Sequence, residues 1–411
     1  MSHSKKIFLI AGEASGDLQA AALIRALKTQ HLNLHFRGLG GSLMAAEGME
    51  LVHDLTKEAA LGLGDVLRKY FTFRRIFYEA LKEVQNYKPD VIILVDYPGF
   101  NLRFAKKINK AVPIIYYISP QIWAWGAKRI HAIRRYIDHL IVFFQFEREL
   151  YEREQVPVTW VGHPLVDLAK PSRARGDLRT EFLPASPRAK LISLLPGSRE
   201  SEVKRMLPEM LAVAALIHQK SPDVRFILSQ SPTLPVSLYQ SIVAQCKPTF
   251  MLSAIRNRSF DLLHASDFAM VSSGTATLEA ALAATPFVIF YKTAQSTFFL
   301  GRHLIRIPYI GLVNVVAGRK IVPEFIQHEI HPETIAQEAL YLLNHEDLKD
   351  KMIADLLQVR QKLGEPGAAN RAADAVLKFL SFPRPLKYSE VRRVSPISVA
   401  EKRESNKLDP R

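Results

Sequence analysis

Short runs of mostly apolar residues recur along the chain, and each leads through a glycine-rich or polar turn into a segment with helical periodicity. Continuous apolar runs of this length are typical of strands buried on both faces of a parallel sheet, and the segments between them are rich in strong helix formers. This alternation predicts an α/β fold with a doubly wound arrangement in each half of the chain. The runs cover residues 6–11, 89–95, 113–118, 140–144, 190–195, 224–229, 268–271 and 287–291.

The pattern is interrupted by a polar stretch with three prolines, which indicates a boundary between two domains. We expect a first domain at 1–168, a linker at 169–188 and a second domain at 189–363. A helix at 364–380 could return to the first domain, and the charged, proline-containing residues 381–411 are typical of a disordered tail. Turns are predicted at 37–41, 311–318 and 323–327, and helical periodicity at 332–363 and 368–380.

The stretch 268–284 carries the strongest chemical signal. An apolar strand gives way to Ser273, Gly274 and Thr275 and then at once to a helix, whose first N–H groups would be free to bind a phosphate or diphosphate. Glu279 lies four residues after Thr275 on the same helix face, where its carboxylate could accept hydrogen bonds from a diol such as ribose. The alternative is a plain connection with a surface glutamate.

A second candidate is Asp96, which directly follows the apolar run 89–95. Ligands of open α/β sheets bind beyond the carboxyl ends of strands, so an acid at this place could act as a general base. The alternative is that Asp96 caps a helix that begins at Leu102.

Two further turns at strand ends contain polar residues. Ser198 and Arg199 follow the run 190–195, and the guanidinium fork of Arg199 could hold a diphosphate or pair with a nearby acid. The turn at 12–17, which includes Ser15 and Asp17, suits a polar ligand but lacks the glycine spacing of dinucleotide-binding folds.

Residues 63–77 alternate apolar and basic side chains at helical spacing. Such a helix could lie on an anionic bilayer, or it could be a surface helix that packs on a core. Trp123 and Trp125 also have basic neighbours, which suits a sugar platform or a membrane boundary, although buried tryptophan is commoner. The residues of the proposed membrane face are Leu63, Val66, Leu67, Tyr70, Phe71, Arg74 and Arg75.

Charge and cysteine content narrow the possibilities. The formal net charge is +15, and the eight basic and four acidic residues of 381–411 account for only +4 of it, so the excess lies mostly on the folded part. This indicates an acidic partner such as a nucleotide, an anionic membrane or nucleic acid. A lone Cys246 excludes a disulfide framework and a cysteine-based zinc site. With no signal-peptide core or membrane-length apolar run, we expect a cytoplasmic protein with at most peripheral membrane contact.

Six motifs occur together and in order, and as a set they closely resemble the bacterial lipid-A-disaccharide synthase family from about residue 6 to 380. One departure is Val313, where the family pattern has a proline before the asparagine. The motifs are 12–17 (GEASGD), 96–101 (DYPGFN), 119–125 (SPQIWAW), 162–165 (GHPL), 195–199 (LPGSR) and 273–279 (SGTATLE).

The resemblance implies an inverting glycosyltransferase of the GT-B arrangement, with two Rossmann-like domains that face each other across a cleft. It implies the transfer of a sugar from UDP-2,3-diacylglucosamine to 2,3-diacylglucosamine 1-phosphate, without a cofactor. The second domain would hold the donor, and the first would hold the acceptor and face the inner membrane. The implied roles are Asp96 as general base, Ser15 and Asp17 at the acceptor, and Ser198, Arg199, Ser273, Gly274, Thr275, Glu279, Asn314 and Gln327 at the donor.

Two other functions remain open from the sequence. A non-hydrolysing UDP-N-acetylglucosamine 2-epimerase would share the nucleotide site but would need no acyl-sugar partner. A non-catalytic basic protein could bind membrane or polyanion, although no recognised nucleic-acid module is present. The chain contains no Asp-x-Asp motif, so a bound divalent metal is not expected.

Overall fold

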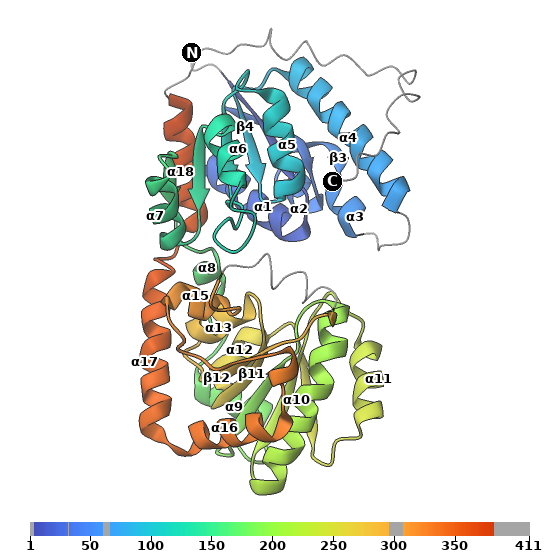
Figure 1. Ribbon diagram of the computed structural model, residues 1–411, viewed down its shortest axis with the longest axis vertical. Helices are drawn as coiled ribbons and strands as arrows, with labels where there is room; N and C mark the ends of the chain where they lie inside the picture. Colours follow the sequence, from blue (N-terminus) through green and yellow to red (C-terminus); the bar gives the residue numbers. More distant parts are fainter. Residues whose placement is uncertain (1–3, 32, 61–65, 296–306, 382–411) are drawn as a thin grey trace, which may run out of the picture.

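The computed structural model describes residues 4–31, 33–60, 66–295 and 307–381, and gives only the backbone of 58–60 and 66–70. The predicted tail lies outside this range except for Ser381. Two α/β domains stack along the long axis of the molecule (Figure 1). Each is built on its own parallel sheet, as the apolar runs predicted.

The first sheet has the strand order β3-β2-β1-β4-β5-β6-β7, with parallel pairing throughout. Its order reverses between β1 and β4, the point at which open sheets bind ligands. The strands are β1 (Lys5–Ala11), β2 (Leu34–Gly40), β3 (Glu50–Asp54), β4 (Val91–Val95), β5 (Ile114–Tyr117), β6 (His139–Val142) and β7 (Val158–Trp160). The helices are α1 (Ala14–Gln30), α2 (Ser42–Ala46), α3 (Leu55–Ala60), α4 (Val66–Tyr87), α5 (Pro98–Ile108), α6 (Arg129–Tyr136), α7 (Gln145–Arg153) and α8 (Leu165–Leu168).

The second sheet repeats this plan in the order β10-β9-β8-β11-β12-β13, with its reversal between β8 and β11. β8 and β11 are buried along their whole length, which explains their continuous apolar sequences. The strands are β8 (Leu191–Leu195), β9 (Arg225–Gln230), β10 (Leu252–Arg256), β11 (Phe268–Ser272), β12 (Phe287–Tyr291) and β13 (Glu324–Ile326). The helices are α9 (Arg175–Phe182), α10 (Glu200–Lys220), α11 (Val236–Cys246), α12 (Ser259–Ala265), α13 (Ala276–Leu282), α15 (Leu312–Ala317), the 3-10 turn η1 (Gln327–Glu329), α16 (Pro332–Asn344), α17 (Glu346–Lys362) and α18 (Ala368–Ser381).

The glycines of 37–41 do not form the turn predicted from them, because β2 runs through Gly38 and ends at Gly40. β2 passes so close to β1 that a Cβ on Gly38 would lie 1.9 Å from the carbonyl oxygen of Leu9. Gly38 therefore serves close strand packing rather than chain reversal.

Two other predicted turns are also regular structure. Most of 311–318 is the short helix α15, which ends at Gly318 in the left-handed conformation (φ +77°), and 323–327 contains the edge strand β13. The helical region 332–363 is divided at His345 into α16 and α17. Elements of three to six residues carry too little periodicity to be recognised in a sequence.

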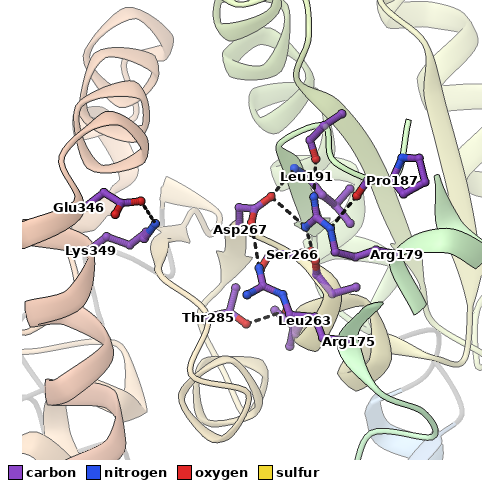
Figure 2. Close-up of polar contacts among 12 residues, drawn as sticks. Arg175, Arg179, Pro187, Leu191, Leu263, Ser266, Asp267, Thr285, Glu346 and Lys349 are labelled. Atoms are coloured by element: carbon purple, nitrogen blue, oxygen red, sulfur yellow. Dashed lines mark hydrogen bonds and ion pairs between the residues drawn. The ribbon is translucent and has the colours of Figure 1, made fainter. Parts of the chain in front are cut away.

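The segment expected to link the domains contains a helix, α9, that packs on the second domain. Leu178 of α9 is fully buried. Figure 2 shows Arg175 and Arg179 converging on the carboxylate of Asp267, with Nη2–Oδ1 and Nη1–Oδ2 distances of 2.8 and 3.0 Å. The same carboxylate accepts the N–H of Leu191 at 2.8 Å. The start of β8 and the end of α12 are thereby fastened to α9.

The chain crosses back to the first domain between α17 and α18, and α18 packs on α1 (Figure 1). The carboxylate of Asp167 accepts the N–H groups of Gly367 and Ala368 at 2.6 and 3.2 Å. Arg371 Nε donates to the carbonyl oxygen of Val161 at 2.8 Å. The outgoing and returning crossings are therefore bonded to each other.

Candidate functional site

A cavity of about 690 Å³ lies between the two domains. The first domain contributes Gln121, Trp123 and Ala124, from the loop after β5. The second domain contributes the turns after its two central strands, at the reversal of its strand order. Among the donor residues proposed from the sequence, those that line the cavity are Ser198, Arg199, Ser273, Gly274, Thr275 and Glu279.

The turn after β11 is shaped by Gly274, whose φ of +147° lies in the region that favours glycine. The N–H of Ser273 donates to Phe290 O at 2.9 Å, and the N–H groups of Thr277 and Leu278 donate to Gly274 O and Thr275 O at 3.1 and 2.9 Å. Because these N–H groups are already hydrogen-bonded, the donors that this turn can offer to a bound anion are the N–H groups of 274–276. Because α13 has only seven residues, binding of an anion here would need charged side chains as well as these N–H groups.

Glu279 lines the cavity and is half-buried. Burial raises the pKa of its carboxyl group, and a hydrogen bond from Ser259 acts in the opposite direction. Ser259 Oγ donates to Oε2 at 2.8 Å and so fixes the orientation of the carboxylate. Ser259 also lines the cavity, but nothing in its sequence context identified it.

Arg199 projects from the start of α10, with its side chain 77% exposed. Its Nη1 lies 3.1 Å from Glu202 Oε1, and Glu202 Oε2 accepts the N–H groups of Ser198 and Arg199 at 3.2 and 3.3 Å. Glu202 therefore engages one guanidinium nitrogen of Arg199 and the two backbone N–H groups at the start of α10. Sequence reasoning missed Glu202, although an acid at the third position of a helix is a common capping signal.

Asp96 follows β4 in a tight turn, in which both Asp96 and Tyr97 have positive φ angles of 46° and 47°. Asn101 Nδ2 donates to the Asp96 carbonyl oxygen at 2.7 Å, and the hydroxyl of Tyr116 donates to the same oxygen. α5 begins at Pro98 with Tyr97 as N-cap and without a side-chain cap bond, so Asp96 does not cap a helix from Leu102.

The environment of Asp96 suits a general base. Burial, and to a smaller extent the nearby negative charge of Glu13, raises the pKa of its carboxyl group to about 6. Asp96 is outside the residues that line the cavity, but β4 pairs with β5, whose following loop forms the cavity wall. Asp96 therefore lies at the sheet edge that faces the second domain.

Three of the proposed site residues have their hydrogen-bonding groups engaged within the protein, away from the cavity lining. The carboxylate of Asp17 accepts the N–H groups of Gly41, Leu43 and Met44 at 2.9 to 3.1 Å and so caps α2. Asn314 is fully buried and bonds Ile321, Val322 and Glu324 through both ends of its amide. Gln327 bonds the backbone of Thr293 at both amide atoms. Ser15 is exposed in the first turn of α1.

The helix expected to face a membrane, α4, runs from Val66 to Tyr87. Its second half packs on the first domain through Ile76, Ala80 and Val84, and the ring of Phe77 contacts Phe100 at a centroid distance of 5.3 Å. Phe71 is 50% exposed, and Arg74 lies 6.0 Å from the Tyr78 ring centre. Arg75 pairs with Glu79 at 3.7 Å. Leu63 lies outside the described residues, and so do the side chains of Val66, Leu67 and Tyr70.

Within residues 4–31, 33–60, 66–295 and 307–381, no helix combines the length and apolar character needed to cross a membrane. No group of three or more His, Cys, Asp or Glu side chains among the same residues could hold a metal ion.

Comparison with known proteins identifies the family. The model of the lipid-A-disaccharide synthetase family matches residues 7–379. Lipid-A-disaccharide synthases of Syntrophus aciditrophicus and Trichlorobacter lovleyi are 38% and 40% identical to the chain, and each match covers 92% of this chain and 98% of the relative. The solved UDP-GlcNAc 2-epimerase of Neisseria meningitidis bound to UDP-GlcNAc has a TM-score of 0.58 over 91% of this chain and 100% of its own, at 11% identity, which shows a shared fold alone. The chain belongs to the lipid-A-disaccharide synthase family and has the GT-B arrangement.

Proposed function

We propose that this protein joins UDP-2,3-diacylglucosamine to 2,3-diacylglucosamine 1-phosphate, forming a β-1,6-linked disaccharide 1-phosphate and releasing UDP. The observation that carries the proposal is the interdomain cavity, in which the phosphate and diol motifs of the second domain face the first domain. Family membership over residues 7–379 supports the same reaction.

The second domain holds the donor. Arg199 and the N–H groups of 274–276 bind the diphosphate, and Glu279 accepts hydrogen bonds from the ribose hydroxyls. Ser198 and Ser273 line the diphosphate site. Asn314 and Gln327 act indirectly, because their amides stabilise the backbone around α15 and β13.

The first domain holds the acceptor and supplies the base. The 6-hydroxyl oxygen of the acceptor attacks the anomeric carbon of the donor as Asp96 takes the hydroxyl proton, and the bond from that carbon to the UDP oxygen breaks. Arg199 stabilises the negative charge that develops on the departing diphosphate. Ser15 contacts the acceptor, whereas Asp17 shapes the same region by fixing residues 41–44.

The same proposal places the protein at the inner face of the cytoplasmic membrane. Each buried CH₂ contributes about 0.8 kcal/mol to membrane retention, so a sugar with two long acyl chains stays in the bilayer and the enzyme must reach it there. The first half of α4 makes this contact, through Phe71, Arg74 and Arg75.

Flotation with anionic liposomes tests the membrane contact. The double variant Phe71→Asn/Arg75→Gln should float less than wild type. A matched control, Leu357→Asn/Arg360→Gln, changes an exposed pair on α17 of the second domain and should float normally. Phe73 is kept, because its ring contacts Tyr97, next to Asp96, at a centroid distance of 6.5 Å. Equal flotation of all three proteins would contradict the contact.

Mass spectrometry with defined substrates tests the reaction itself. Donor alone should remain unchanged, and donor with the acyl-sugar phosphate should give disaccharide and UDP in equal amounts. Conversion of the donor alone to an epimer would support the 2-epimerase alternative. The absence of any conversion in both mixtures would favour the non-catalytic alternative.

A further inference from the structure

Glu147 is a buried carboxylate to which the proposed reaction assigns no role. It lies in the first turn of α7 and is 4% exposed. Its three hydrogen-bond donors are all neutral: Ser119 Oγ and Trp123 Nε1 donate to Oε1 at 3.1 and 3.0 Å, and the N–H of Phe144 donates to Oε2 at 3.3 Å. Burying a carboxylate without a cationic partner is unfavourable, so its presence needs a reason.

Helix capping explains only one of the two oxygens. The bond from Phe144 N–H to Oε2 is the return half of a capping box, which glutamine at this position could also provide. Oε1 instead binds two side chains of the loop 119–125, which follows β5 in the neighbouring part of the sheet. This second oxygen therefore ties α7 to another segment of the first domain.

The tied loop is the part of the first domain that lines the interdomain cavity. Trp123 is in that lining, opposite the turns that carry Arg199 and Glu279. Its ring meets Phe146 edge-on at a centroid distance of 5.2 Å, and Tyr151 of α7 donates to Pro120 O at 3.0 Å. Glu147 Oε1 accepts the indole N–H and so restrains the rotation of the ring.

We infer that Glu147 is a positioning residue, which holds Trp123 as a fixed wall of the donor sugar and diphosphate site. This inference rests on the proposed function only in assigning the cavity to the UDP-sugar. A tryptophan ring presents a flat apolar face against which a sugar can pack, and this contact depends on the orientation of the ring. Without an acceptor for its N–H, the half-buried indole would turn to find another.

Three variants separate this role from general stability. Glu147→Leu removes the acceptor and should lower kcat/KM for the sugar transfer about 10- to 100-fold, the range expected for an unpaired buried donor. Glu147→Gln keeps an acceptor oxygen for Ser119 and Trp123 and should stay within about 5-fold of wild type. Glu152→Leu changes an exposed acid of the same helix and should have no effect.

A double-mutant cycle shows whether Glu147 acts through Trp123. Trp123→Phe keeps a ring but loses the N–H, so adding Glu147→Leu to it should cost little more than Trp123→Phe alone. If Glu147→Leu costs the same factor in both backgrounds, the inference is wrong. If Glu147→Leu does not fold, the Gln variant decides: a loss of 10-fold or more in a folded Glu147→Gln protein also overturns it.

Fluorescence separates failure of this inference from failure of the proposed function. The emission of Trp123, taken as the difference between wild type and Trp123→Phe, should change when UDP is added, and this change should be lost or altered in Glu147→Leu. No response to UDP in wild type would count against the donor site itself. A normal response in both wild type and Glu147→Leu would leave the donor site intact and overturn the role of Glu147.

Discussion

The carboxyl-terminal edges of the two sheets share one topology but hold their functional groups in different ways. In the first domain, Asp96 is half-buried in a turn with two positive φ angles, and its carbonyl oxygen is bonded by Asn101 and Tyr116. In the second, the guanidinium of Arg199 is 77% exposed and pairs with Glu202. In the proposed roles, the base would be held in place before substrate arrives, whereas Arg199 would have to exchange Glu202 for the diphosphate.

The largest effect should follow from removing the fixed base. Asp96→Asn keeps the shape of the side chain but cannot take a proton, so kcat should fall roughly 10²- to 10⁴-fold, measured as UDP release. Asp90→Asn is a matched control. Asp90 directly precedes β4, at the opposite end of the strand from Asp96, and pairs with Lys5. Turnover at the wild-type rate in Asp96→Asn would exclude Asp96 as the base.

Arg199→Ala should have the next largest effect, because it removes the cation that stabilises the leaving diphosphate. We expect a loss of about 10²- to 10³-fold in kcat. The thermal unfolding midpoint should change little, because the side chain is mostly exposed. Arg205→Ala, which removes another arginine of α10, controls for the change of charge. A midpoint that fell as sharply as the activity would indicate a structural role instead.

Acid should slow the reaction, and the pH at which this happens should follow the pKa of Asp96. Asp96 must be ionised to accept a proton, and because its pKa is raised to about 6, kcat/KM should fall about tenfold at pH 5. The same raised pKa affects stability in the opposite direction. Folding favours the protonated carboxyl group of Asp96, so its contribution to the free energy of unfolding is present at low pH and is lost as the pH rises through about 6. Asp96→Asn should therefore be more stable than wild type at pH 8. A rate that stays flat down to pH 4.5 would contradict the assignment.

The smallest effect should come from Glu202, the acid that occupies the anion site. Glu202→Gln removes a negative charge that competes with the diphosphate, so the Kd for UDP should fall roughly 3- to 10-fold, measured by calorimetry. Glu200→Gln, an exposed acid of the same helix that pairs with Lys204, is the control. Weaker UDP binding in Glu202→Gln would mean that the capping bonds to Ser198 and Arg199 matter more than the competition.

The central strands were readable from the sequence because burial on both faces leaves a continuous apolar run, as in β4 and β11. Asp96, directly after β4, and Arg199, in the turn after β8, could be picked out as candidates for the same reason. The glycines of β2 were misread, because glycine is typical of turns and the close approach to Leu9 is visible only in three dimensions. The edge strand β10 is largely exposed and has no apolar run.

The site was harder to predict where a polar residue serves the fold. Asp17 and Asn314 stand in suitable turns, but their side chains bond backbone groups of other segments. Which partner a buried polar group finds depends on long-range packing that no local pattern contains. Conversely, Ser259 and Glu202 contact the site residues and carry only ordinary helix-start signals.

The bonds of Asp167 and Arg371 between the two chain crossings give the domains a common pivot. Two domains joined on one side can rotate about that joint but cannot separate by translation. We therefore expect any domain motion to be a rotation about these crossings, which would change the distance between Asp96 and Arg199 while the crossings stay together.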